Sequence, residues 1–385
     1  MMRNMFKTII DMKKLFTIGL LVAGSVLLGA CEKDSKDSDE DHGYEEEAVL
    51  DAIYVVNAGN AAASIPASIT VIDNSLHRVR QDSYRKQNGR DMEGTPADVL
   101  ANGLDNRIFI AYPDKDIVEL IDGQTLKSLQ KISTTGLFGD KGKGPKKMIW
   151  HFSHLLVLTD AGYMLSLSDE LEAETAYEVG PRSTAMISLS RQNVIEVLHS
   201  GQGAEAPYLS GIRFTDGSSS YTMTSEELLT NPVEYIHVYD QYAAFILNAG
   251  NDGKAGSVIL RKWDEEPALR KIADATFVCN GNDNNGNALF MINTATGVKP
   301  TYSKYNIITD AVSTFVEDGE KYPTAIAADY AYRNTICVTS RPSANINSTE
   351  NGYVTIYDLN GNIQGKYEVG VNPSFISFSY IYERK

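Results

Sequence analysis

The chain has few cysteines, histidines and basic residues, and each shortage excludes a class of function. Its three cysteines are too few for a disulfide framework, and their spacing matches no zinc site. With 35 Lys and Arg against 50 Asp and Glu, the formal net charge is −15, and no basic stripe interleaves with aromatic residues. A surface this acidic repels phosphate backbones, so we expect no nucleic acid as a partner.

Motifs that carry catalysis are also missing. The chain contains no Gly-x-Ser-x-Gly elbow, no His-Glu-x-x-His pair and no glycine-rich phosphate loop. Among the six histidines, His151 and His154 lie closest together, but an expected turn separates them and no acidic cluster follows. We therefore expect no metal, no cofactor and no enzyme activity.

The longest apolar run lies close to the start of the chain. Residues 15–28 are largely apolar, follow Lys13 and Lys14, and precede an acidic stretch. This run is too short for a membrane span and indicates a secretion signal over residues 1–30. The sequence Leu-Gly-Ala-Cys at 28–31 resembles the bacterial lipobox, which implies cleavage before Cys31 and lipidation of that cysteine. A chance cysteine behind a signal peptide is the alternative.

Residues 31–48 carry nine acidic side chains, two lysines and almost nothing apolar. Such a segment cannot bury a core and indicates a flexible tether. Loss of residues 1–30 would remove four basic residues and one acidic residue, which moves the net charge to −18. Acidic residues after a lipidated cysteine also resemble the surface-export signal of Bacteroidetes lipoproteins, and a plain spacer is the alternative. We expect an outer-membrane location facing the cell exterior, with membrane contact through the lipid only.

An internal repeat fills the rest of the chain, residues 49–385. Short runs of alternating or β-branched residues are separated by Gly, Asn, Asp and Pro, a pattern typical of β-strands. A strand that ends in an aspartate recurs at intervals of 49, 47, 47, 48, 46 and 48 residues. The seven aspartates are Asp73, Asp122, Asp169, Asp216, Asp264, Asp310 and Asp358.

Each repeat contains the same order of segments. An apolar strand, often opened by proline, is followed by a second apolar strand, the strand ending in Asp, and a more polar fourth strand. Four antiparallel strands in 45 to 50 residues make one propeller blade, so the sequence predicts an all-β, seven-bladed β-propeller. The only helix-like stretch is 225–229. The opening prolines are Pro96, Pro145, Pro181, Pro232, Pro323 and Pro373.

The two ends of the repeat region predict how the ring closes. Residues 53–57 have the pattern of a second strand, and no first strand precedes them. Residues 373–380 follow the seventh aspartate and have the pattern of a first strand. We expect this C-terminal strand to join the N-terminal blade, which closes the ring and removes an exposed sheet edge.

Tyr54-Val55-Val56-Asn57, followed by the strand 69–73, resembles the YVTN or YncE-like propeller repeat over essentially residues 50–382. The start at 53–60 further resembles Bacteroidetes surface lipoproteins of this fold, including the cobalamin-binding partner of the outer-membrane corrinoid transporter. Those proteins usually have an acidic residue where this chain has Ala58. The resemblance implies a monomeric lipoprotein that captures a scarce nutrient and passes it to a TonB-dependent transporter. A corrinoid is the first choice, and an iron siderophore or a glycan are the alternatives.

Candidate ligand contacts lie near the loops that join second to third strands and blade to blade. These loops share one face of the propeller, whereas the aspartate turns share the other. The candidates are amides, cations and aromatic rings that could contact a polar ligand, and turn formation, ion pairing and packing are the alternative roles. They are Asn57, Asn60, Tyr112, Lys146, Lys147, Arg182, His199, Tyr208, Tyr235, Asn248, Asn251 and Arg341.

Two other classes of function stay open. Propeller loops could assemble a lyase or hydrolase acting on a glycan, for which paired carboxylates near the axis would be the sign. A structural or adhesin role would need a protein partner and a large exposed apolar patch. Cys279 and Cys337 lie in apolar strands, and we expect buried free thiols, with a bridge between neighbouring blades as the alternative.

Overall fold

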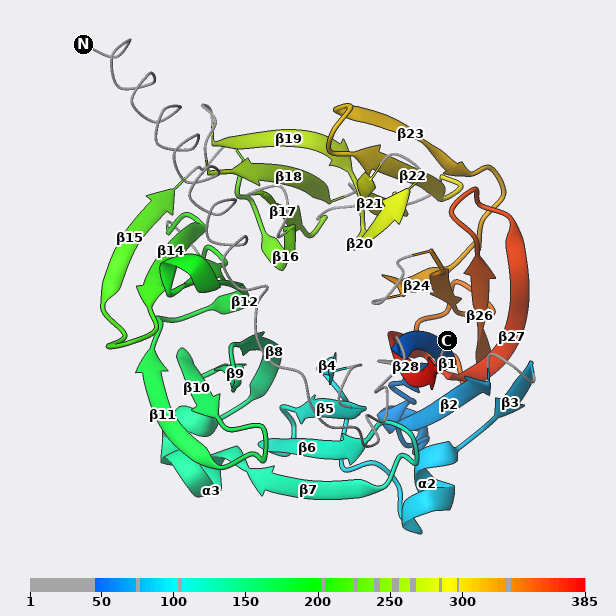
Figure 1. Cartoon of the computed structure of the whole chain (residues 1–385), viewed down its shortest axis with the longest axis horizontal. Helices are drawn as coiled ribbons and strands as arrows, with labels where there is room; N and C mark the ends of the chain where they lie inside the picture. Colours follow the sequence, from blue (N-terminus) through cyan, green and yellow to red (C-terminus); the bar gives the residue numbers. More distant parts are fainter. Residues whose placement is uncertain are drawn as a thin grey trace, which may run out of the picture. The chain divides into compact units, whose positions relative to one another are not determined.

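Seven four-stranded antiparallel sheets form a ring, which confirms the predicted seven-bladed β-propeller (Figure 1). Residues 46–384 belong to one compact unit. The computed structural model describes residues 46–73, 77–102, 106–202, 205–224, 228–238, 243–250, 256–263, 268–283, 286–295, 298–329 and 334–384. Cys31 and the expected signal peptide lie outside these residues.

The first four blades run from the innermost to the outermost strand as follows. Blade one contains β28 (Pro373–Arg384), β1 (Glu46–Asn57), β2 (Ser68–Asp73) and β3 (Arg78–Arg80). Blade two contains β4 (Asp98–Asn102), β5 (Arg107–Tyr112), β6 (Ile117–Asp122) and β7 (Ser128–Ser133). Blade three contains β8 (Pro145–His151), β9 (His154–Thr159), β10 (Tyr163–Leu167) and β11 (Ala173–Glu178). Blade four contains β12 (Ser183–Leu189), β13 (Val194–His199), β14 (Tyr208–Arg213) and β15 (Ser219–Thr224).

The last three blades repeat this order. Blade five contains β16 (Pro232–Val238), β17 (Ala243–Asn248), β18 (Ser257–Lys262) and β19 (Leu269–Asp274). Blade six contains β20 (Phe277–Asp283), β21 (Gly286–Asn293), β22 (Thr301–Asn306) and β23 (Ala311–Val316). Blade seven contains β24 (Pro323–Ala328), β25 (Ile336–Ser340), β26 (Asn351–Tyr357) and β27 (Ile363–Val371).

The core consists of seven apolar clusters, one at each interface between neighbouring blades. Second strands such as β13 and β17 are buried at every position because both faces of a blade pack on neighbours. Fourth strands such as β7 alternate between exposed and partly buried residues because they form the rim. The order of apolar and polar strands within each repeat therefore follows the radial position of each strand.

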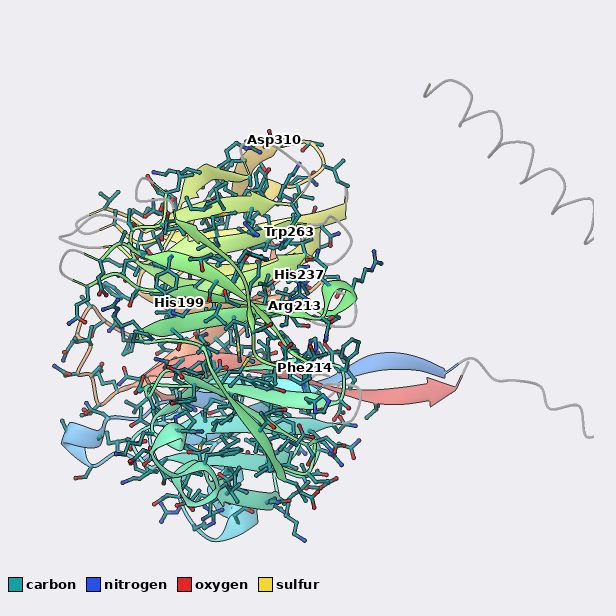
Figure 2. The ribbon with its side chains drawn as sticks, turned by 90° about the vertical axis from the view of Figure 1, so that its left-hand side faces the viewer. His199, Arg213, Phe214, His237, Trp263 and Asp310 are labelled. Carbon is teal, nitrogen blue, oxygen red and sulfur yellow. The ribbon has the colours of Figure 1, made fainter. Side chains whose placement is uncertain are left out.

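The ring closes as the sequence predicts, through β28 and β1. These two strands pair antiparallel from Asn57 and Pro373 outward to Glu46 and Arg384. Beyond the body of the blade they continue as a two-stranded extension, which projects from one face of the ring (Figure 2). Strand β1 begins at Glu46, three residues inside the range expected to form the tether, because it pairs with the last residues of β28.

The recurring aspartates that the structure describes lie where third strands turn into fourth strands. In several blades their carboxylates accept backbone N–H groups of the turn, whereas Ser168 and Asn306 do so in blades three and six. Asp122 Oδ1 accepts the backbone N–H groups of Gln124 at 3.1 Å and Thr125 at 2.7 Å. Asp358 Oδ1 accepts those of Asn360 and Asn362 at 2.8 and 2.9 Å. This is the local backbone bonding expected of aspartate in turns. Asp264 lies outside the described residues.

The helices differ from the sequence-based expectation. Residues 225–227 lie outside the described part of the chain, and Leu228 and Leu229 are not helical. Helices instead form at α2 (Ser83–Asn88) and α3 (Thr134–Phe138), with 3-10 turns at η1 (Ala61–Ala63), η2 (Gly139–Gly142) and η3 (Ser190–Gln192). Helix α2 has six residues and buries only Ser83 and Tyr84. A helix this short shows no apolar periodicity in the sequence.

Within the described residues, no helix is both long and apolar enough to cross a membrane. Cys279 and Cys337 are free and buried, as predicted. Cys279 packs in the cluster between blades six and seven, and Cys337 packs in the cluster between blades seven and one. Burial raises the pKa of both thiols well above the ordinary value.

Candidate functional site

The inner strands of six blades surround a cavity of about 460 Å³, which we call the axial cavity. It lies near the first residues of these strands and therefore near the face that carries the second-to-third-strand loops and the blade connections, called the loop face below. Much of its wall is apolar, as in small-molecule sites generally. The apolar wall includes Val99, Val233, Phe277, Ile326, Phe375 and Ile376.

Three charged side chains meet at the axial cavity and are called the charged trio below. Lys147 Nζ lies 2.6 Å from Glu234 Oε2 and 3.8 Å from Asp98 Oδ1. Asp98 Oδ2 accepts the backbone N–H of Met148 at 2.7 Å, which fixes the carboxylate on the neighbouring strand. The exposed fractions are 13% for Asp98, 24% for Lys147 and 36% for Glu234, so Glu234 is the most accessible of the trio.

Burial and the neighbouring charges shift the pKa values in this trio. Burial alone would lower the pKa of Lys147, but Glu234 and Asp98 raise it well above its ordinary value. The ammonium group therefore stays charged at neutral pH. Burial raises the pKa of Asp98, although Lys147 acts in the opposite direction.

The three charged residues occupy the same position at the start of their inner strands. The residue two positions after the opening proline lines the cavity in five blades. In β8, β16 and β24 the pairing register shifts between these two positions, and such bulges re-aim side chains. The pairs are Pro96 with Asp98, Pro145 with Lys147, Pro232 with Glu234, Pro323 with Ala325 and Pro373 with Phe375.

The predicted loop-face amides hold the scaffold together. Asn57 is buried, and its Nδ2 donates to Thr70 Oγ1 at 3.1 Å and Ser68 Oγ at 3.2 Å. Asn248 is also buried and cross-links the end of β17 to the start of β18 and to the backbone of residues 228–231. Asn60 caps η1 and donates to the carbonyl of Asn347 at 3.1 Å, whereas Asn251 lies outside the described residues.

Arg182, His199 and Tyr208 form a separate cluster at the loop face of blade four. The His199 and Tyr208 rings stack with centroids 4.1 Å apart, and His199 Nε2 lies 2.9 Å from Ser210 Oγ. Burial lowers the pKa of His199 to about 4, so the ring is neutral at pH 7. Arg182 pairs with Glu205 and donates to the Ser200 carbonyl. None of these three side chains lines the axial cavity.

Among the remaining predicted cations, Lys146 pairs with Asp160 at 2.7 Å and does not line the cavity. Arg341 follows β25, and burial lowers its pKa. Its Nε is buried without an acceptor, and no carboxylate of the described residues pairs with it. Lys147 is thus the only predicted site residue, among the residues that the structure describes, that lines the axial cavity.

Tyr112 and Tyr235 are buried against carboxylates, which places them out of reach of a ligand on the loop face. Tyr112 donates to Glu119 Oε2 at 3.1 Å, and Tyr235 donates to Glu196. Burial raises the pKa of both tyrosines, and the adjacent carboxylates add to this effect. Apolar packing with a polar tip was the alternative role for these rings, and their position agrees with it.

His151 and His154 lie at the face opposite the loop face, where first strands turn into second strands. His151 is buried with Nδ1 2.8 Å from Ser188 Oγ, and His154 Nδ1 lies 2.7 Å from Glu174 Oε2. Phe214 packs on both imidazole rings. In Figure 2 Phe214 lies toward one face of the propeller and His199 toward the other. The described part of the chain contains no group of three or more potential metal ligands.

No protein-family model and no curated protein sequence matches the chain. The periplasmic gluconolactonase PpgL of Pseudomonas aeruginosa is 13% identical with a TM-score of 0.59, over 85% of this chain and 99% of that protein. AztD of Citrobacter koseri, in its apo form, is 13% identical with a TM-score of 0.55, over 86% and 98%. A Bacteroides uniformis protein provisionally named 6-phosphogluconolactonase is 11% identical with a TM-score of 0.55, over 85% and 99%. At these identities the likeness shows the shared propeller fold.

These comparisons correct one expectation. The prediction that the chain is not an enzyme is wrong, because solved propellers of this architecture include proteins named as lactonases. Missing linear motifs are weak grounds for that exclusion, since a propeller brings together side chains that are distant in sequence. Asp98 and Glu234, which meet here, are 136 positions apart. The resemblance to YncE-like propellers and to Bacteroidetes lipoproteins stays a prediction.

Proposed function

We propose that the axial cavity binds a small ligand, with the charged trio as its polar anchor and the apolar wall as the contact for its body. The charged trio carries this proposal. Charges removed from water cost several kcal/mol each unless they are paired, and the trio lies at a cavity rather than between packed blades. A few convergent polar groups on a mostly apolar concave surface are typical of ligand sites.

The size of the cavity bears on the choice of ligand. Pockets for drug-sized molecules hold about 300–1,000 Å³, and 460 Å³ lies in the lower half of that range. A corrinoid is much larger than such molecules and would have to lie across the loop face. Capture of a nutrient by a surface lipoprotein, followed by transfer to a TonB-dependent transporter, stays a proposal that this geometry leaves open. A small sugar or a related ring compound fits the cavity itself.

A second candidate function is hydrolysis of a lactone or a similar ester, which the pairing of Glu234 with Lys147 favours. Glu234 would take a proton from a water molecule whose oxygen attacks the acyl carbon. Lys147 would donate an N–H to the acyl oxygen as negative charge develops there. The ring C–O bond would then break, and its oxygen would take the proton back from Glu234. The lactonase names among the solved propellers support testing this reaction.

Binding can be tested by filling the cavity. Ala325 lines it, so Ala325→Phe should abolish the thermal stabilisation that members of a small-molecule panel give the full chain. Ala311→Phe, on the exposed edge strand β23, is the matched control and should leave the response unchanged. Equal responses in wild type and Ala325→Phe would place the ligand elsewhere.

Hydrolysis can be tested by acid release, because opening a neutral lactone produces a carboxylic acid. We expect faster acidification of glucono-1,5-lactone than the spontaneous rate, and a loss of about 100-fold in Glu234→Gln. An unchanged rate in Glu234→Gln, or a rate equal to the background with wild type, would remove this second candidate and leave the binding proposal intact.

A further inference from the structure

The arrangement of charge in the axial cavity discriminates between ligands. Resting on the binding function proposed above, we infer that the cavity takes uncharged, polyhydroxylated ring compounds and rejects their carboxylate and phosphate forms. Three features carry this inference: the hydrogen-bonding groups that remain available, the sign of the local charge and the shape of the apolar wall.

The hydroxyl groups in the cavity wall already have partners. Thr324 Oγ1 donates to the Pro373 carbonyl, and Ser374 Oγ donates to the Asn372 carbonyl at 2.9 Å. Thr276 Oγ1 lies 2.9 Å from Thr294 Oγ1. These hydroxyls can add neutral hydrogen bonds, and the trio supplies the charged side chains of the cavity wall.

Within the trio, a donor stands beside an acceptor. The ammonium of Lys147 has three N–H groups and lies 2.6 Å from Glu234 Oε2. Among the residues that the structure describes, the contact of the other carboxylate oxygen, Oε1, is a long one of 3.4 Å from the N–H of Tyr235. A ligand hydroxyl can accept from the ammonium and donate to the carboxylate at once. A ligand carboxylate or phosphate can only accept, so it satisfies one of the two.

The local charge acts in the same direction. Two carboxylates and one ammonium leave the trio with a net charge of −1 when all three are ionised. A second negative charge a few ångströms away is repelled because the partly buried site screens poorly. The same net charge attracts an organic cation, so the selection acts against the anionic forms of the ligand.

The apolar wall suits the other side of such a ligand. Phe277 of β20 and Phe375 of β28 line the cavity, are partly exposed and also pack against the clusters between blades, while the mostly buried Ile326 lines it from β24. A sugar ring presents hydroxyl groups at its edge and C–H groups on its faces. Its edge can bond the trio while a face packs on this wall.

Three hexose derivatives that differ in charge provide the test: glucose, glucuronate and glucosamine, with the galactose series beside them. Calorimetric titration of the full chain in detergent should give a dissociation constant for a neutral sugar at least tenfold lower than for its acid, while the amine should bind no more weakly than the neutral sugar. Glu234→Gln, and Asp98→Asn with Glu234→Gln, should reduce the preference over the acid to about threefold or less. Asp160→Asn removes the same charge from the Lys146 pair on the loop face and should leave the ratio unchanged.

The outcomes separate the two levels of the proposal. Binding of the acid as tight as that of the neutral sugar, or binding of the amine as weak as that of the acid, would overturn the charge selection while leaving a ligand site at the cavity. No binding of any hexose, together with stabilisation by other compounds that Ala325→Phe abolishes, would overturn the polyol class alone. If Ala325→Phe changes the response to no compound, the proposed function itself fails.

Discussion

A buried carboxylate between blades four and five offers a sharp test of how the ring is held together. Glu196 on β13 is fully buried and accepts hydrogen bonds from Arg261 Nη2 at 2.6 Å and Trp263 Nε1 at 3.3 Å. The hydroxyls of Tyr221 and Tyr235 donate to the same carboxylate. We predict that Glu196→Leu strongly destabilises the propeller because four donors from two blades lose their acceptor.

The magnitude follows from the burial of the partner. Arg261 is 4% exposed, so without Glu196 its charge stays buried and unpaired. Breaking a buried ion pair by removing one partner costs about 3–5 kcal/mol, out of a typical total of about 5–15 kcal/mol. In the double variant Glu196→Leu with Arg261→Met, no buried charge remains unpaired. The double variant should therefore be more stable than Glu196→Leu by about 2 kcal/mol or more.

Urea denaturation followed by tryptophan fluorescence measures both effects, since Trp263 belongs to the cluster. Glu174→Gln is the control because Glu174 pairs with His154 at the surface, and it should cost less than about 1 kcal/mol. A cost below about 1 kcal/mol for Glu196→Leu would refute the reasoning. So would a double variant less stable than the single one, which would mean that packing and not charge controls this interface.

Three further predictions concern closure, pH and the thiols. Deletion of residues 374–385 removes the inner strand β28 of blade one, so the shortened chain should lose the cooperative melting transition seen by circular dichroism; an unchanged curve would refute the closure. Burial lowers the pKa of His199 from its ordinary value of 6.5 to about 4 in the folded chain, so the unfolded chain binds the extra proton. Stability should therefore fall by up to about 3 kcal/mol as the pH drops from about 6.5 to 4. His199→Leu should make the urea midpoint depend less on pH between about 6.5 and 4. A pH dependence as steep as that of wild type would contradict this. In a Cys31→Ser variant, Cys279 and Cys337 should resist a thiol reagent until urea unfolds the chain, and rapid native labelling would show that they are accessible.

Much of the fold could be predicted because its signals repeat along the chain. The aspartates lie in equivalent turns, and seven copies at nearly constant spacing specify seven blades. The unpaired second-strand pattern at 53–57 and the spare first-strand pattern at 373–380 specified the closure. The short helices α2 and α3 gave no such signal, because they occur once each and bury few side chains.

The candidate site was predicted less well, since single residues do not show whether they point to the axis or into a blade. Asn57, Tyr112, Tyr235 and Asn248 have the chemistry of ligand contacts. The Asn57 and Asn248 amide N–H groups instead make cross-strand hydrogen bonds, and the two tyrosine hydroxyls donate to buried carboxylates. Asp98 and Glu234 were overlooked. Both stand two residues after an opening proline, the same position as Lys147, and this spacing was the signal that could have found them.

The sequence by itself determined the blade number, the order of strands within a blade, the ring closure and the turn chemistry, because each depends on local patterns that recur every 46 to 49 residues. Only the tertiary structure decided that Asp98, Lys147 and Glu234 meet at one cavity. Their positions are separated by 49 and 87 residues along the chain, and they come together because the ring brings the openings of all inner strands to the same axis. Bulges after the prolines re-aim Lys147 and Glu234, and that register depends on pairing between strands, which no single strand specifies.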